Sequence, residues 1–208
     1  MKGEFLPINE PLEYFVDARG AGPGKVGCSV QGPVRPDDYD ADAPVITDNE
    51  DGTFKIVYTP DDAGRLKMNA TFAEAAIPDT PIKLHVYDAS QVVANGKGLE
   101  DGNVSGELTH FTVDMRKGGE GRLHVGINGP GRTPVTIKDQ ANNVVNCEYI
   151  PLEAGEYDIN ILWEGVHIPN SPYHISIKPS VDSNAVAVYG EGLAVSYTHL
   201  TLPTILLV

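Results

Sequence analysis

Apolar and polar residues alternate one by one along most of this chain. The alternation is clearest over 155–164, where Tyr157, Ile159 and Ile161 are separated by an acidic and an amide side chain. Successive residues of a strand point to opposite faces of a sheet, so this pattern predicts half-buried antiparallel strands. No window of 11 or more residues carries the apolar stripe of an amphipathic helix. The chain is therefore expected to be almost entirely β-structure.

Turn signals divide the alternating segments at regular intervals. They recur every 8 to 12 residues, for example at Gly32-Pro33, at Asp51-Gly52 and at Gly129-Pro130. Short strands at this spacing are typical of an all-β sandwich. The second half of the chain is predicted to hold seven strands, which we letter A to G in chain order. They are expected at 91–96, 109–116, 122–128, 134–139, 144–150, 155–164 and 172–178.

The same sequence pattern occurs twice in the chain. Residues 14–33 read YFVDARGAGPGKVGCSVQGP, and residues 111–130 repeat them as FTVDMRKGGEGRLHVGINGP. The segment 77–81, IPDTP, returns at 168–172 as IPNSP. A period near 94 residues is the size of one small domain. The predicted fold is therefore a tandem pair of immunoglobulin-like β-sandwiches.

This repetition sets the expected domain boundaries. Residues 1–89 form a first repeat that lacks its first strand, because that strand would fall before Met1. Residues 90–180 form a complete repeat, and residues 181–196 begin a third. The last residues, 197–208, turn abruptly apolar and break the register of both repeats, so we interpret them as a non-native tail.

Charge and cysteine content narrow the class of protein. The formal net charge of -14 argues against nucleic acid or an anionic membrane as a partner, since both need clustered Lys and Arg. Cys28 and Cys147 lie at non-equivalent positions of the two repeats, which does not suit a disulfide framework. No apolar run follows Met1, so no signal peptide is expected. These features favour a cytoplasmic protein with reduced thiols and no direct membrane insertion.

Several short motifs recur in a fixed order. They are F-x-V-D-x-R-x-x-G-x-G at 111–121, G-P at 129–130, D-G-T-F-x-I-x-Y-T-P at 51–60, A-G at 154–155 and I-P-x-S-P at 168–172. In this order the motifs resemble the immunoglobulin-like repeat of filamins, over about residues 4–193. Antibody-type domains differ, because they pair a cysteine on strand B with one on strand F and bury a tryptophan on strand C. Here that pair is missing and Trp163 falls on strand F.

The resemblance implies a function as well as seven-strand filamin-type repeats. Filamins are actin-crosslinking scaffolds of the cytoplasmic cytoskeleton, and their repeats bind partner peptides along strand C, in the groove between strands C and D. The mode is β-strand addition, in which an extended peptide pairs with a free strand edge. The implied partners are extended peptides such as integrin or other adhesion-receptor cytoplasmic tails. Actin would be bound only through a module absent from this chain.

Residue by residue, the resemblance places the peptide-binding positions on strands C and D of each repeat. In the second repeat they are Leu123, His124, Gly126, Val135 and Ile137, and in the first they are Val26, Gly27, Ser29 and Ile46. Glycines on strand C are expected to allow a close backbone approach. The first repeat departs from the pattern by about six extra residues before Gly52 and by Pro44 on strand D, which removes a ladder donor. Apolar positions on these strands would also suit the core of any sandwich, so both interpretations stay open.

Other candidate chemistry is weak. The four aspartates within 37–42 lack the glycine and the terminal glutamate of an EF-hand loop. The glycine-rich segment 20–25 lacks the spacing and the following Ser or Thr of a phosphate loop. No histidines pair at metal-ligand spacing, and Cys147 alternates inward as a core thiol. The sequence therefore predicts no metal site, no cofactor and no enzymatic activity.

Two other contexts stay open for such repeats. One is a signalling or ubiquitin-ligase scaffold of the tripartite-motif class, where a single repeat is usual. The other is an extracellular adhesion array with calcium at its joints. The tandem copy argues against the first, and the expected absence of a signal peptide does not favour the second.

Overall fold

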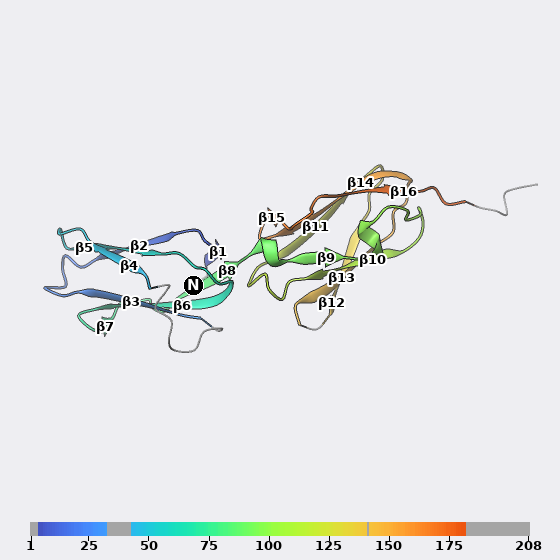
Figure 1. Ribbon diagram of the computed structural model, residues 1–208. Helices are drawn as coiled ribbons and strands as arrows, with labels where there is room; N and C mark the ends of the chain where they lie inside the picture. The colour runs from blue at the N-terminus through green and yellow to red at the C-terminus, as the bar shows by residue number, and fades with distance from the viewer. Residues whose placement is uncertain (1–3, 33–42, 141, 182–208) are drawn as a thin grey trace, which may run out of the picture.

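The computed structural model describes residues 4–32, 43–140 and 142–181 (Figure 1). These residues form two β-sandwiches in succession, and each sandwich consists of two sheets. In Figure 1 the strands from β1 to β8 make up the first sandwich, and those from β9 to β16 make up the second. The predicted fold, a tandem pair of immunoglobulin-like β-sandwiches, is confirmed.

In the first repeat, one sheet has the strand order β1-β8-β6-β3, with β7 pairing with β6, and the other has the order β2-β5-β4. The strands of the first sheet are β1 (Glu4–Pro7), β3 (Val26–Gln31), β6 (Gly64–Phe72), β7 (Ala75–Ala76) and β8 (Ile82–Tyr87). Those of the second sheet are β2 (Leu12–Asp17), β4 (Val45–Asp48) and β5 (Thr53–Tyr58). The equivalents of strands C and D are β3 and β4.

In the second repeat, one sheet has the order β9-β10-β13-β12, and the other has β11, β15 and β16 arranged around β14. The strands of the first sheet are β9 (Val93–Asn95), β10 (Thr109–Asp114), β12 (Val135–Gln140) and β13 (Val144–Tyr149). Those of the second are β11 (Leu123–Asn128), β14 (Gly155–Trp163), β15 (Val166–His167) and β16 (Tyr173–Ile177). All seven predicted strands are present, and each boundary lies within two residues of the expected one.

The inward positions of the alternating pattern form the core of the second repeat. On β14, Tyr157, Ile159 and Ile161 are each 1% exposed or less. Trp163 ends the strand and is buried, and its indole Nε1 donates a hydrogen bond of 2.8 Å to the carbonyl oxygen of Gly118. A buried polar nitrogen is therefore satisfied, as a buried tryptophan requires.

The first repeat contains a strand ahead of β2, but this strand, β1, is not the counterpart of the predicted strand A. β1 pairs in parallel with β8, and Pro7 lies opposite Tyr87. The same place in the second repeat is taken by the parallel bridge between Val104 and Lys178. What the described residues of the first repeat lack is a counterpart of β9, the strand that pairs with β10. Two separate segments therefore precede the second strand of the sandwich. One pairs with β10, as β9 does, and the other pairs in parallel with the last strand, as β1 does. The sequence pattern did not distinguish them.

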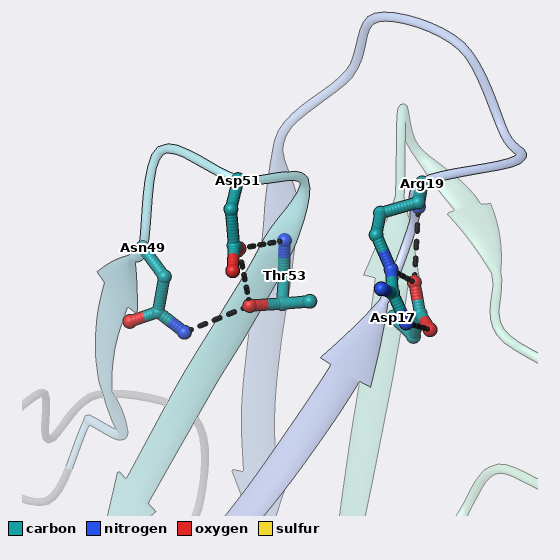
Figure 2. A network of polar contacts seen from close by, with 5 residues as sticks. All are labelled: Asp17, Arg19, Asn49, Asp51 and Thr53. Atoms are coloured by element: carbon teal, nitrogen blue, oxygen red, sulfur yellow. Dashed lines mark hydrogen bonds and ion pairs between the residues drawn. The ribbon is translucent and has the colours of Figure 1, made fainter.

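The V-D-x-R motif forms a turn after the second strand of each sandwich. In Figure 2, Asp17 accepts hydrogen bonds from the backbone N–H and from the guanidinium of Arg19, at 3.1 Å from the backbone nitrogen and 2.9 Å from Nε. Asp114 and Arg116 make the same contacts in the second repeat. The hydrogen bonds from the arginine lower the pKa of each aspartate to about 2. The motif thus has a local structural role in both repeats.

The D-G-T motif closes the neighbouring turn of the first repeat (Figure 2). A carboxylate oxygen of Asp51 accepts from the backbone N–H of Thr53 at 2.9 Å and from its hydroxyl group. The amide nitrogen of Asn49 donates to the same hydroxyl oxygen at 2.9 Å. Side chains that bond to nearby backbone in this way stabilise turns. The motif residues that carry the family resemblance here are turn formers and do not surround a binding site.

The joint between the repeats is short, and residues of the first repeat contact residues of the second across it. Residues 89–91 form a single 3-10 turn, η2 (Ala89–Gln91), and a second, η3 (Lys97–Leu99), follows β9. Tyr87 bridges to Gly119, and the backbone N–H of Glu120 donates to the carbonyl oxygen of Val86 at 3.2 Å. Gly119 has φ +73°, and a Cβ there would lie against the Val86 carbonyl oxygen. The loop before β11 therefore approaches the first repeat more closely than a larger residue would allow.

Charged side chains also cross the joint. Glu120 forms an ion pair with Arg65 at 2.7 Å, and His85 Nδ1 lies 2.7 Å from the other carboxylate oxygen of Glu120. Burial opposes ionisation of Glu120, but the hydrogen bonds from Arg65 and His85 outweigh it, so its pKa lies below the usual value. The joint is thus held by backbone pairing and by a charge cluster.

Three predictions concern segments outside the described residues. They are the start of a third repeat at 181–196, apart from Val181 itself, the tail at 197–208, and the aspartates within 37–42.

Candidate functional site

The outer edge of β11 is open within the part of the chain that the structure describes. β11 pairs only with β14, and β12 pairs only with β13, so each is the last strand of its sheet. The two strands belong to different sheets of the same sandwich. We call the space between their edges the groove, and Leu123 of β11 and Ile137 of β12 line a pocket in it. An edge strand presents unpaired N–H and C=O groups, which is the requirement for strand addition.

The predicted residues of the second repeat divide between two faces. Leu123 and Val135 are partly buried against the core, and Ile137 is 45% exposed on the same face of β12 as Val135. His124 and Gly126 alternate with the inward residues of β11, so they lie on its outer face. The prediction therefore brings together three groove residues and two residues that point away from the groove.

Two groove residues were missed by the sequence reasoning. Val125 and Ile127 of β11 are partly buried and pack against the core, as Leu123 does. The alternation of the strand carried this signal, because residues at 123, 125 and 127 must share one face. The inward face of β11 thus carries three partly buried apolar side chains, which pack against the core.

The two strand-C glycines have different surroundings. A Cβ on Gly126 would meet nothing within 4 Å, so the outer face of β11 is open at this point. A Cβ on Gly27 would lie 2.7 Å from the hydroxyl oxygen of Thr71. Both glycines are expected to leave room for another backbone. Open space around the glycine is found at Gly126 and not at Gly27.

In the first repeat the predicted residues lie on β3 and β4. Val26, Gly27 and Ile46 are half-buried and Ser29 is exposed. β3 pairs only with β6, and β4 only with β5, among the described residues. Pro44 precedes β4, so it does not remove a donor from within the strand as expected.

The described residues show no candidate metal site and no activated thiol. They contain no group of three or more His, Cys, Asp and Glu side chains that could hold a metal ion. Burial raises the pKa of the Cys147 thiol to about 11 and also raises that of Cys28, so neither thiolate is favoured at neutral pH. Within the same ranges, no helix is long and apolar enough to span a membrane.

The fold of the two repeats and their open strand edges place the chain in a class of proteins, the tandem immunoglobulin-like β-sandwiches. The sequence profile of the Filamin/ABP280 repeat matches residues 2–83 and 86–174. The chain belongs to the filamin repeat family. Repeats of this family are structural, protein-interaction modules and not catalytic ones.

The relatives match both repeats but are much longer. Filamin-C of Mus musculus is 34% identical over 192 residues, which cover 89% of this chain and 7% of that protein. Filamin-A of Drosophila melanogaster is 29% identical over 204 residues, which cover 95% of this chain and 9% of that protein. The chain thus spans less than a tenth of the length of either relative.

Among solved structures, the fold is similar to that of the Escherichia coli adhesin FdeC. The TM-score is 0.53 at 12% sequence identity, and the match covers 86% of this chain and 62% of that one. At this identity the likeness concerns the fold alone.

Proposed function

We propose that this chain is a segment of a filamin rod, a non-enzymatic scaffold of the cytoplasmic actin cytoskeleton that binds partner peptides at the groove between strands C and D. The observation that carries the proposal is the edge of β11, which is unpaired among the described residues and whose Leu123 lines a pocket together with Ile137 of β12. Membership of the filamin repeat family supports the scaffold role.

Binding follows from the geometry of the edge. A peptide in the extended conformation pairs its backbone with β11 and extends the sheet that contains β14. Every second peptide side chain then points into the groove, where it meets the inward residues of β11 and β12. They are Leu123, Val125, Ile127, Val135 and Ile137. Backbone pairing gives affinity, and the apolar groove selects alternating apolar side chains.

Cytoplasmic tails of integrins and other adhesion receptors are the partners that we assign to this groove. Such tails are extended peptides, and strand addition to a free edge requires an extended peptide. We assign actin contact to a module outside these 208 residues. The first repeat is the weaker candidate, because it departs from the family pattern by the extra residues before Gly52 and by Pro44 ahead of β4.

The alternative contexts are not favoured. Both relatives described above match across the two repeats together, and both are filamins. A calcium-bridged adhesion array would need acidic clusters at the joint, and the described residues contain no group of acidic, His and Cys side chains that could hold a metal ion.

An NMR titration of the whole chain with an integrin β-subunit tail peptide tests the proposal. We expect the largest shifts on β11 and β12. Ile137→Glu is expected to weaken binding, because it places a charge in the apolar groove. Val93→Glu is the matched control, since Val93 on β9 of the same sheet is 49% exposed against 45% for Ile137. Shifts confined to other strands, or equal effects of both variants, would contradict the proposal.

A further inference from the structure

A cavity lies at the end of the groove that is nearest to the joint. Its volume is about 440 Å³, which is within the usual range for a small-ligand site. From the second repeat it is lined by Leu123 and Ile137, the two groove residues at this end, with Trp163 and Met115 beside them. From the first repeat it is lined by Phe5. The cavity is therefore shared between the two repeats.

Phe5 is fixed as a wall of this cavity from both sides of the joint. Its ring stacks on the imidazole of His85, with ring centroids 5.0 Å apart and an interplanar angle of 26°. The guanidinium carbon of Arg122 lies 5.3 Å from the Phe5 ring centroid on the side of the second repeat. Phe5 nevertheless remains 38% exposed. An aromatic group that is held in place but still exposed can contact a ligand with little loss of conformational freedom.

Charges around the cavity leave one acid without a counterion. Glu120 is paired with Arg65 and with His85, and Arg122 is paired with Glu164 at 3.1 Å. Asp139 also lines the cavity and is exposed. Within the described ranges, its carboxylate has no hydrogen-bond or ion-pair partner. The rim of the cavity therefore complements a positive charge.

The length of β11 relates this cavity to the groove. Residues 123, 125 and 127 present three inward levels, and successive levels on one face of a strand lie about 6.6 Å apart. A peptide paired along β11 therefore places three alternating side chains in the groove, and the one at the level of Leu123 meets the cavity.

We propose that the groove of the second repeat is completed by Phe5 of the first repeat, forming an end pocket for a bulky apolar side chain and for a basic side chain two positions away in the peptide. The inference rests on the proposed function, since the peptide is placed by strand addition to β11. Phe5 and Trp163 enclose the apolar side chain, and Asp139 pairs with the basic one. The preceding repeat is then a determinant of peptide specificity, and the tandem pair is the binding unit.

The test compares the binding of an integrin β-subunit tail peptide, and of its single alanine variants at each apolar position, to wild-type chain and to Phe5→Ala. We expect Phe5→Ala to weaken the parent peptide by about three- to tenfold. For one apolar position of the peptide, the alanine variant and the parent peptide should bind Phe5→Ala with the same affinity. The side chain at that position is the one that contacts Phe5, so removing either partner removes the same interaction. Phe5→Leu should restore most of the loss.

Two control variants isolate the ring from other effects. Phe15→Ala removes an equally large aromatic group from β2, where it is 70% exposed, and should leave the affinity unchanged. Arg65→Gln cuts the ion pair across the joint at a residue that does not itself line the cavity, although its partner Glu120 does. If Arg65→Gln weakens binding as much as Phe5→Ala does, the orientation of the repeats is responsible, and the end pocket is wrong.

A second variant tests the charge. Asp139→Asn should weaken peptides that carry a basic residue two positions from the apolar one and leave their glutamine variants unchanged. Peptide-induced shifts on β11 together with equal affinity for wild type, Phe5→Ala and Asp139→Asn would overturn the end pocket and leave the groove intact. Absence of any shift on β11 would overturn both proposals.

Discussion

The two repeats share their motifs, but they bury the same strand to different depths. Phe111 and Val113 on β10 are fully buried, whereas their counterparts Tyr14 and Val16 on β2 are half-buried. The difference lies in the strand beside them: β9 pairs with β10, and no described strand pairs with the corresponding edge of β2. A shared motif set therefore specifies the sandwich, while the segment that precedes it determines how completely the core closes.

The residues around β9 show how that closure is achieved. Val92, Ala94 and Leu99 are buried in the core of the second repeat. The phenol of Tyr149 reaches across to η3 and donates to the carbonyl oxygen of Gly98 at 2.6 Å. In the first repeat, β1 covers the edge of β8 instead and adds only Leu6 to the core. β9, the predicted strand A, thus contributes packing to the second repeat that β1 does not supply to the first.

The largest effect is expected from the aromatic residue at the end of strand F. Trp163→Ala should reduce the free energy of unfolding of the second repeat by about 3–5 kcal/mol, because it leaves a cavity in a closed core. Phe72→Ala at the equivalent position of the first repeat should cost less, since Phe72 is only half-buried. Urea unfolding followed by far-UV circular dichroism measures both losses. Equal losses would contradict the difference in closure.

Hydrogen exchange tests the comparison without mutation. Amides of 91–178 should be more protected than those of 14–87, with the largest contrast between β10 and β2. A tenfold difference in exchange corresponds to about 1.4 kcal/mol of opening free energy. The edge of β2 that lacks a β9 equivalent should exchange first. Equal or greater protection over 14–87 would refute the prediction that the first repeat is the less stable one.

Strand positions could be predicted from the sequence because their signal is local. The alternation over β14 and the turns on either side of it depend only on neighbouring residues, and the predicted boundaries lie within two residues of those observed. The same alternation contained the groove residues Val125 and Ile127. The family pattern alone does not select these two residues, and it includes His124, which faces outward on β11.

The joint could not be predicted in this way. Glu120 meets Arg65 from 55 residues away, and Phe5 reaches the cavity from still farther along the chain. Such contacts depend on how one folded repeat docks on the next, and no period within either repeat encodes that arrangement. The glycine at 119 was visible as part of a turn signal, but its closeness to Val86 was not.

An intermediate effect is expected from the hydroxyl that ties η3 to the core. Burial raises the pKa of the Tyr149 phenol, so it remains a donor throughout the neutral range. Tyr149→Phe leaves the buried Gly98 carbonyl unpaired and should destabilise the second repeat by about 1–3 kcal/mol. Tyr173→Phe is the control, because the hydroxyl of Tyr173 makes a longer, exposed hydrogen bond of 3.3 Å to Pro169. If both variants unfold at the same urea concentration, η3 is not needed to close the core.

The smallest effect on stability is expected at the joint, where the two repeats meet. Glu120→Gln removes the charge that pairs with Arg65 and His85, and a partly exposed pair of this kind contributes at most about 1 kcal/mol. The pKa of Glu120 is depressed below its usual 4.5, so the contribution of the carboxylate is complete above about pH 4.5 and is lost as the pH falls through the folded value. At neutral pH the Glu120 carboxylate is therefore ionised and keeps its ion pair with Arg65.

The sharper readout for this variant is the relative motion of the repeats. Residual dipolar couplings of wild type should fit one alignment tensor for both repeats, and Glu120→Gln should require a separate tensor for each. Glu148→Gln is the matched control, because Glu148 pairs with Lys138 at 2.6 Å within the second repeat and away from the joint. One common tensor in both variants would show that the backbone pairing of Tyr87 with Gly119 holds the joint by itself, and the charge cluster would then have no part in its rigidity.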